Sequence, residues 1–170
     1  MAASAKASEI GKKSRDNGAL FEKYIIKSCA EYERRGIAYI QKNPEPMHII
    51  KPYGQNGWFV TNFAKKAQPD FKGVLKGGRT VIFDAKHTDK DRILQTAINE
   101  VQAEFLDGYE KLGAICFVLV SIGMENFYRV PWMVWKDMKS MFKHKYMNAD
   151  DLKPYKVKGS IQNIQFLPEV

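Results

Sequence analysis

Hydrophobic positions near the start of the chain recur at helical spacing. Phe21, Ile25 and Cys29 follow one another at four-residue intervals, so their side chains share one face of a helix. Gly36 comes soon after them and suits a helix end. The pattern therefore predicts a first helix over residues 14–34.

Two later segments have the same helical spacing. Apolar residues in 96–112 fall on one face and Gly113 follows them, whereas Pro131 suits the first turn of a last helix that contains Trp132 and Trp135. Shorter apolar runs, bounded by Gly, Pro or Asn, are typical of strands. They predict strands over residues 37–41, 47–50, 70–75, 80–85, 114–121, 127–130 and, at a sheet edge, 161–167.

A glycine pair, Gly77-Gly78, lies between the strands predicted at 70–75 and 80–85. A two-residue turn of a β-hairpin needs positive φ, which glycine adopts without strain, so these two strands are expected to form a hairpin. The strand at 114–121 is apolar on both faces, which places it near the centre of a sheet. The order of helices and strands predicts an α/β fold, a mixed β-sheet flanked by helices.

The chain has 170 residues, enough for one domain with a substantial core. Residues 1–13 are rich in Ala, Ser and Lys and precede the first periodic apolar positions. We therefore expect a disordered basic arm over 1–13 and a single domain over 14–170.

Charge points to an anionic partner. Lys and Arg number 27 against 19 Asp and Glu, a net charge of +8, and nucleic acid is a common partner of such domains. A surface that is merely basic gives the same count.

No apolar run reaches the roughly twenty residues of a membrane helix, and Cys29 and Cys116 resemble reduced core cysteines, so we expect a cytoplasmic protein and no membrane partner.

The candidate chemistry lies on the glycine hairpin. Asp70 opens one strand, and Asp84 and Lys86 close the other, two positions apart and so on one face. Two facing carboxylates repel unless a cation lies between them, and hard oxygen ligands suit Mg²⁺ or Mn²⁺. Such a site fits phosphodiester hydrolysis, with Lys86 orienting water or stabilising the phosphate. The alternative is an exposed ion pair of Asp70 with Lys86.

A second candidate is the segment 51–68, where aromatic residues alternate with lysines and glycines. Aromatic rings can stack on unpaired bases while amines meet phosphates. The segment is expected to be a projecting loop or ribbon, although an aromatic hairpin packed on its own body has the same composition. The candidate DNA contacts in it are Lys51, Trp58, Phe59, Phe63, Lys65 and Lys66.

Several motifs together resemble the RecU family of Holliday junction resolvases, within the PD-(D/E)xK nuclease superfamily. They extend over nearly the whole chain after the N-terminal arm. They are Asn-Gly-Ala-Leu-Phe-Glu at 17–22, Lys-Asn-Pro-Glu-Pro at 42–46, Pro-Asp-Phe-Lys-Gly-Val at 69–74, Phe-Asp-Ala-Lys-His-Thr at 83–88, Gln102, and Gly-Ala-Ile-Cys-Phe-Val at 113–118.

The resemblance implies a restriction-endonuclease-like core in which Asp70 and Asp84 bind the metal and Lys86 is catalytic. Glu22 and Gln102 take supporting roles, although an exposed helical glutamate and a surface amide are the ordinary interpretations of those two. The segment 51–68 corresponds to the family's stalk. This chain has Asp84 where the family usually has Glu, which shortens one metal ligand by a methylene.

The resemblance also implies the function: a Mg²⁺-dependent endonuclease, with Mn²⁺ as substitute, that resolves four-way junctions as a homodimer during recombination and repair. A recombinase or a branch-migration motor is a further partner by analogy. Two alternatives stay open. One is a nuclease of the same fold that acts on other branched or duplex DNA, and the other is a DNA-binding protein without catalysis.

Overall fold

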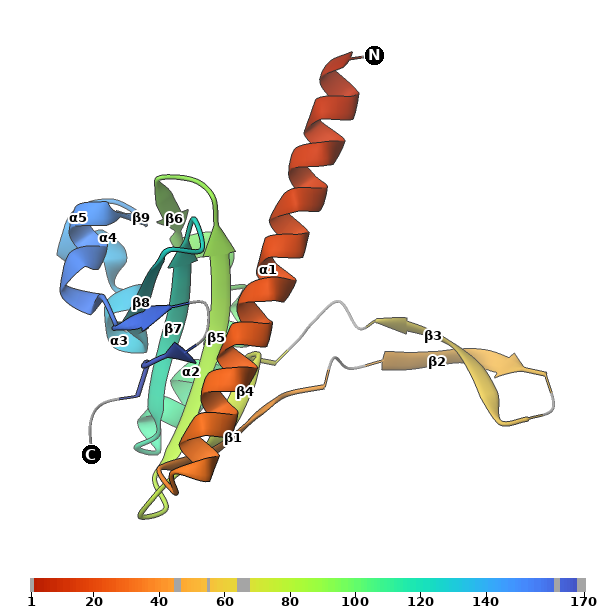
Figure 1. Ribbon diagram of the computed structural model, residues 1–170, viewed down its shortest axis with the longest axis horizontal. Helices are drawn as coiled ribbons and strands as arrows, with labels where there is room; N and C mark the ends of the chain where they lie inside the picture. The colour runs from red at the N-terminus through yellow and green to blue at the C-terminus, as the bar shows by residue number, and fades with distance from the viewer. Residues whose placement is uncertain (1, 45–46, 55, 64–67, 161–162, 168–170) are drawn as a thin grey trace.

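The computed structural model describes residues 2–44, 47–54, 56–63, 68–160 and 163–167 (Figure 1). Their centre is a five-stranded sheet in the order β1-β4-β5-β7-β8. β5 and β7 run parallel and the other neighbours run antiparallel, which confirms the mixed sheet. Its strands are β1 (Ala38–Lys42), β4 (Phe71–Leu75), β5 (Thr80–Thr88), β7 (Ile115–Ile122) and β8 (Asn126–Pro131).

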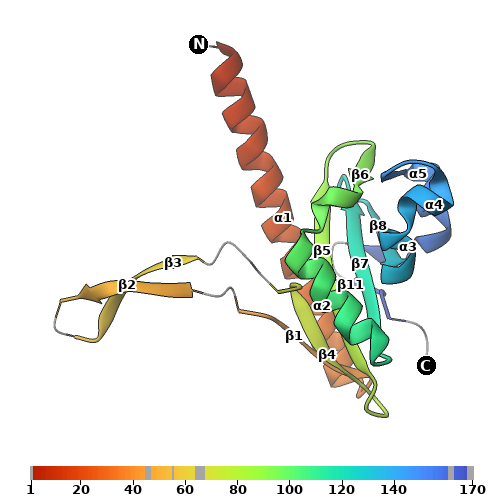
Figure 2. The same cartoon turned by 180° about the vertical axis from the view of Figure 1, so that it is seen from behind.

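Helices cover both faces of this sheet. α1 (Ala2–Arg34) crosses one face, and α2 (Glu100–Lys111) connects β5 to β7 on the other, as Figures 1 and 2 show from opposite sides. The α1 face contains a row of stacked rings, Phe71, Phe83 and Phe117, with centroids 4.9 and 4.6 Å apart. Because β5 alternates its side chains, Phe83 packs under α1 while Asp84 points toward α2.

The remaining short elements pack at the β8 side of the sheet and beyond the end of β5. These elements are α3 (Trp132–Lys136), α4 (Met138–Phe142), α5 (Ala149–Leu152), the 3₁₀ turns η1 (Gln95–Ala97) and η2 (Lys153–Tyr155), and the two-stranded pairs β6 (Arg92–Leu94) with β9 (Tyr146–Asn148) and β10 (Gly159–Ser160) with β11 (Asn163–Ile164).

Within the described residues, no helix combines the length and the hydropathy that crossing a bilayer requires.

The segment between β1 and β4 leaves the main sheet as a hairpin of its own. β2 (Met47–Tyr53) pairs antiparallel with β3 (Trp58–Phe63), and this ribbon projects away from the body (Figures 1 and 2). Gly54 and Gly57 at its tip both have positive φ, 69° and 72°. The segment is therefore the projecting ribbon that its glycine-broken aromatic pattern predicts, and not a hairpin packed on the body. We call residues 47–63 the stalk.

All three predicted helices differ in extent from the observed ones. α1 begins at Ala2, not at residue 14, so residues 2–13 are helical where composition predicted a disordered arm. Alanine and lysine are strong helix formers, and they outweigh the single glycine there, Gly11. α2 begins at Glu100, because Asn99 caps it. The predicted last helix is divided at Asp137 into α3 and α4.

The strand predicted at 161–167 is much shorter in the structure. Only the two residues Asn163–Ile164 form strand β11 there, and residues 161–162 lie outside the described part of the chain. Phe166 and Leu167 follow it as buried core residues beneath α1, which explains the apolar pattern without a long strand.

Candidate active site

The hairpin of β4 and β5 brings the two predicted carboxylates together. Gly77 and Gly78 have φ of 92° and 90°, the positive values that a tight turn requires. The register pairs Phe71 with Phe83, so Asp70, directly before β4, and Asp84 of β5 are the next residues outward. Asp70 Oδ2 accepts a hydrogen bond of 2.9 Å from the backbone N–H of Ala85, which ties the first carboxylate to the second strand.

Asp84 is completely buried, with a side-chain exposure of 0%. Its Oδ1 accepts a hydrogen bond of 2.5 Å from Gln102 Nε2 of α2. Lys86 Nζ lies 2.6 Å from Oδ2, so the two groups form an ion pair. Lys86 thus offsets the charge of Asp84, and because each carboxylate oxygen has two lone pairs, both oxygens keep coordinating capacity.

Burial dominates the electrostatics of both acids. It raises the pKa of Asp84 to about 7, against the lowering effect of Lys86, and the neighbouring Asp70 raises it further. Burial likewise raises the pKa of Asp70, and Lys86 opposes the shift. Two carboxyls on adjacent strands with raised pKa values are the pattern expected where a cation is to be bound.

Gln102 reaches Asp84 because the start of α2 orients it. Asn99 caps the helix by accepting from the backbone N–H of Gln102, and Gln102 Oε1 accepts from the backbone N–H of Asn99, which closes a capping box. The amide oxygen is thereby occupied, and the amide nitrogen is left to donate to Asp84. Gln102 is buried, so it is not the surface amide that its sequence context alone suggested.

Glu22 of α1 approaches the site from the other helix. Its Oε2 lies 2.6 Å from Lys42 Nζ at the end of β1, and both charges act on the pKa of Asp70, Glu22 raising it and Lys42 lowering it. Next to Lys42, Asn43 donates to the carbonyl oxygen of Pro69 at 2.6 Å and so fixes the backbone just before Asp70. Sequence reasoning did not assign Lys42 or Asn43 to the site, although both belong to the motif at 42–46.

The donor set fits a hard divalent cation. Asp70, just before β4, and Asp84 of β5 offer carboxylate oxygens side by side, and Lys86 Nζ lies 2.6 Å from Asp84 Oδ2. Among the described residues no three His, Cys, Asp or Glu side chains form a metal cluster. Mg²⁺ commonly takes one or two carboxylates and completes its shell with water and phosphate oxygens, so two protein ligands suffice for it.

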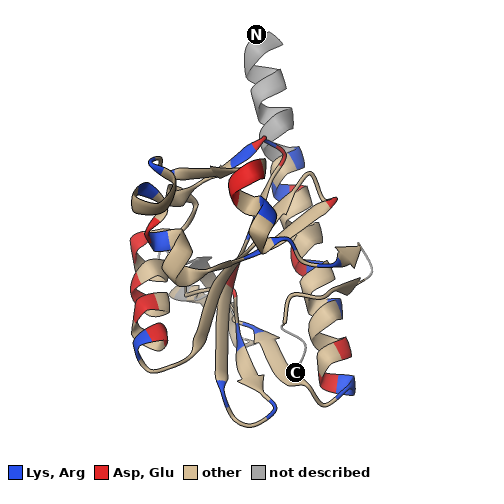
Figure 3. Cartoon of the chain, turned by 90° about the vertical axis from the view of Figure 1, so that its left-hand side faces the viewer, with Lys and Arg blue, Asp and Glu red and all other residues tan. Residues whose placement is uncertain are grey.

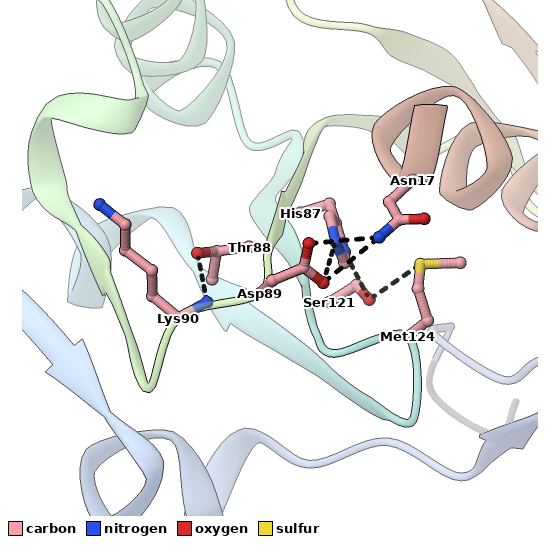
Figure 4. A network of polar contacts seen from close by, with 7 residues as sticks. All are labelled: Asn17, His87, Thr88, Asp89, Lys90, Ser121 and Met124. Carbon is pink, nitrogen blue, oxygen red and sulfur yellow. Dashed lines mark hydrogen bonds and ion pairs between the residues drawn. The ribbon is translucent and has the colours of Figure 1, made fainter. Parts of the chain in front are cut away.

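A separate chain of polar contacts lies on the α1 face at the end of β5 (Figure 4). His87, almost fully buried, contacts Ser121 Oγ of β7 at 3.2 Å through Nδ1 and Asp89 Oδ1 at 3.1 Å through Nε2. Asn17 of α1 donates to both oxygens of Asp89, at 3.3 and 3.2 Å. These contacts therefore hold α1 against β5, the strand that carries the site. Lys86 neighbours His87 in sequence and so points to the opposite face of the sheet.

We expect His87→Leu to destabilise the fold by about 1–3 kcal/mol, because it leaves the buried Ser121 hydroxyl without its imidazole partner. Asn17→Ala, which removes an exposed contact to the same Asp89, should change stability by no more than about 0.5 kcal/mol. Urea unfolding of the two variants measures both values. Equal losses would mean that the buried contact of His87 with Ser121 contributes no more to stability than the exposed contact of Asn17 with Asp89.

Three of the six predicted DNA contacts are described with their side chains, and all three lie on the stalk. Lys51, Trp58 and Phe59 are exposed there, the two rings to 70% and 51%. Phe63 ends β3, but its side chain lies outside the described part of the chain, as do Lys65 and Lys66. On the body, by contrast, acidic residues follow one another along α2 (Figure 3), so that helix is an unfavourable surface for DNA.

Fold and site together define an α/β protein with two acids and a lysine on one hairpin of a mixed sheet, the arrangement of PD-(D/E)xK nucleases. The family model described as RecU, Recombination protein U, matches residues 16–169. The chain belongs to the RecU family.

Curated relatives agree with this assignment. A Holliday junction resolvase RecU of Streptococcus sanguinis is 33% identical over 110 residues, 62% of this chain and 54% of that protein. Those of Pediococcus pentosaceus and of Streptococcus equi subsp. equi are both 31% identical, the first over 61% of this chain and 53% of that protein, the second over 68% and 60%. The chain thus spans a little over half the length of the curated relatives it matches.

A solved structure of Hjc, described as a Holliday junction resolvase from Archaeoglobus fulgidus, covers 82% of this chain and 89% of its own length. Its TM-score is 0.48 at 12% sequence identity, a similarity on which no inference rests.

Proposed function

We propose that this protein is a metal-dependent endonuclease that resolves four-way DNA junctions by paired nicks. The observation that carries the proposal is the position of Asp70, tied to the backbone of Ala85, beside the buried Asp84 of β5, which has Lys86 Nζ 2.6 Å away. Membership of the RecU family and the names of its curated relatives support the junction as substrate.

Each residue of the site has a distinct task in this proposal. Bound Mg²⁺, or Mn²⁺ in its place, supplies Lewis-acid polarisation of the scissile phosphate and lowers the pKa of a water. Asp70 and Asp84 hold the ion, and Gln102 fixes the rotamer of Asp84 through its 2.5 Å hydrogen bond. Lys86 is placed to stabilise negative charge on the phosphate, and Glu22, paired with Lys42, supports the charge balance around Asp70.

The stalk supplies a means of choosing branched DNA. Its exposed rings present flat faces, which can stack on bases that a branch point leaves without a stacked neighbour. Stacking tolerates any base sequence, so selection by shape does not require reading of base edges. Lys51 of the stalk adds a positive charge that can contact the phosphate backbone of the DNA, and Lys65 and Lys66 follow the stalk in sequence.

A symmetric homodimer belongs to the same proposal. One site hydrolyses one phosphodiester at a time, whereas resolving a junction takes two nicks related by the two-fold axis of the DNA. A two-fold dimer, the commonest small assembly, supplies two sites with that symmetry. Mixed dimers of wild-type and Asp70→Asn subunits should therefore nick one strand only. A monomer on junction DNA that still cuts both strands would contradict the dimer.

Substrate choice separates the proposal from its two alternatives. Labelled four-way junction and a linear duplex of matched sequence are incubated with the protein in Mg²⁺, Mn²⁺ or EDTA. Cleavage of the junction alone supports the proposal, and equal cleavage of the duplex indicates a nuclease of other specificity. Binding without cleavage in either metal indicates a DNA-binding protein without catalysis.

The raised pKa of Asp84 makes stability without metal depend on pH. A carboxyl with a pKa of about 7 when folded and 3.8 when unfolded keeps its proton longer in the folded chain. Its contribution to the free energy of unfolding is therefore complete below about pH 4 and is lost as pH rises toward 7, at about 1.4 kcal/mol for each pKa unit.

Urea unfolding in EDTA, compared between wild type and Asp84→Asn, isolates this contribution. The wild type should lose stability relative to the variant between about pH 4 and pH 7, and Mg²⁺ should restore it above pH 7, because the ion binds the ionised carboxyl. A difference that does not change with pH would show that Asp84 titrates normally.

A further inference from the structure

Arg129 lies at the far edge of the sheet from the stalk, on β8. Its strand neighbour is Leu119 of β7, and its guanidinium lies over the ring of Phe117, 4.9 Å from the centroid. That cation–π contact places the guanidinium on the α1 face of the sheet.

One nitrogen of the guanidinium has no acceptor within the described part of the chain. Its Nε is buried and without a hydrogen-bond partner, and no ion pair of that part involves Arg129. Burial lowers the pKa of this group, with Tyr32 opposing the shift, yet an arginine stays charged at neutral pH. A buried donor without an acceptor is costly, so the Nε–H of this half-buried arginine calls for a partner.

A pocket of about 270 Å³ opens beside Arg129. A second cation, Lys156, lines it and is steadied by a hydrogen bond of 2.8 Å from its Nζ to Asn126 Oδ1. Gln165 adds an amide, and among the described residues no acidic one lines the pocket. The lining residues are Arg129, Pro131, Pro154, Tyr155, Lys156, Val157, Gln165, Phe166 and Leu167.

We infer that this pocket is a phosphate-binding site, separate from the Asp70–Asp84 site. The planar guanidinium offers parallel N–H donors that match two oxygens of a phosphate, and Lys156 adds a compact charge at the wall. The volume exceeds what one phosphate needs, so a phosphate carrying a substituent also fits. Two sources share this chemistry, a phosphodiester of bound DNA and a free phosphate, and the site lies on the opposite face from Asp84.

The first arm of the test uses inorganic phosphate and the intact wild-type chain. Titration should shift the Nε–H signal of Arg129 in a ¹⁵N spectrum, and phosphate should raise the melting temperature of wild type but not of Arg129→Gln or Lys156→Ala. Arg79→Gln is the control, because Arg79 is exposed and donates its Nε to the Gly113 carbonyl. The wild-type spectrum requires no variant to fold.

The second arm uses linear duplex DNA without divalent metal, so cleavage plays no part. If a DNA phosphate fills the pocket, Arg129→Gln should lower the slope of log affinity against log salt by about 0.9, while Arg79→Gln leaves it unchanged. A response to inorganic phosphate alone supports the site with a free phosphate as ligand, and a response in the DNA arm supports it with a phosphodiester. An unmoved Arg129 signal and an unchanged salt slope would overturn the inference, whether or not the protein proves to be a nuclease.

Discussion

Asp84→Asn is expected to lower the cleavage rate of a four-way junction by about a thousandfold, with the fold retained. The substitution keeps the shape of the buried side chain but removes the charge that holds the cation, and loss of a preorganised electrostatic group costs up to about that factor. Junction affinity should stay level or rise, because one negative charge near the DNA phosphates is gone. Single-turnover cleavage and a binding titration on the same substrate measure the two effects.

Asp91→Asn is the matched control for this variant. Asp91 is 80% exposed and pairs with Arg92 outside the site, so the same chemical change there should leave cleavage intact. Asp84→Asn that cleaves at the rate of Asp91→Asn would remove Asp84 from the site. Should Asp84→Asn unfold instead, Asp70→Asn offers the same test from a less buried carboxyl on the neighbouring strand.

The stalk variant Trp58→Ser with Phe59→Ser should weaken junction binding by about thirtyfold or more, while binding to linear duplex changes little. Each stacked base is worth about 1–3 kcal/mol, and both rings project from the stalk into solvent. Competition between labelled junction and unlabelled duplex gives the ratio of affinities directly.

Tyr109→Ser serves as control for the stalk variant, since Tyr109 is an exposed ring on α2, away from the stalk. A circular dichroism spectrum unchanged from wild type shows that the stalk rings are not part of the core. If the double variant folds and still prefers junction over duplex by the wild-type ratio, the stalk does not select the branch.

The sequence was sufficient to predict the hairpin that carries the acids, for local reasons. Gly77-Gly78 specifies a turn, strand alternation puts Asp84 and Lys86 on one face, and pairing across the turn brings Asp70 opposite them. Each step depends on a few neighbouring residues. The projection of the stalk followed in the same way from glycines that break its aromatic pattern.

Features that depend on distant residues could not be predicted in this way. Gln102 reaches Asp84 only because Asn99 caps α2, and Lys42 meets Glu22 only once α1 crosses the sheet. Nothing near Arg129 in the sequence indicates that its guanidinium lies over Phe117 beside a pocket formed by the last part of the chain. The helical start of α1 follows from the helix propensity of its alanines and lysines, although the same composition is also typical of a disordered arm.

The single-turnover nicking rate of a labelled four-way junction, measured as Mg²⁺ is titrated from an EDTA-treated start, decides whether Asp70 and Asp84 form the metal site of a junction nuclease. We expect no nicking in EDTA, a rate that rises and saturates with Mg²⁺ for wild type, and a rate about a thousandfold lower for Asp84→Asn at every Mg²⁺ concentration. Nicking that persists in EDTA, or that Asp84→Asn performs as well as wild type, would contradict this assignment of the metal site.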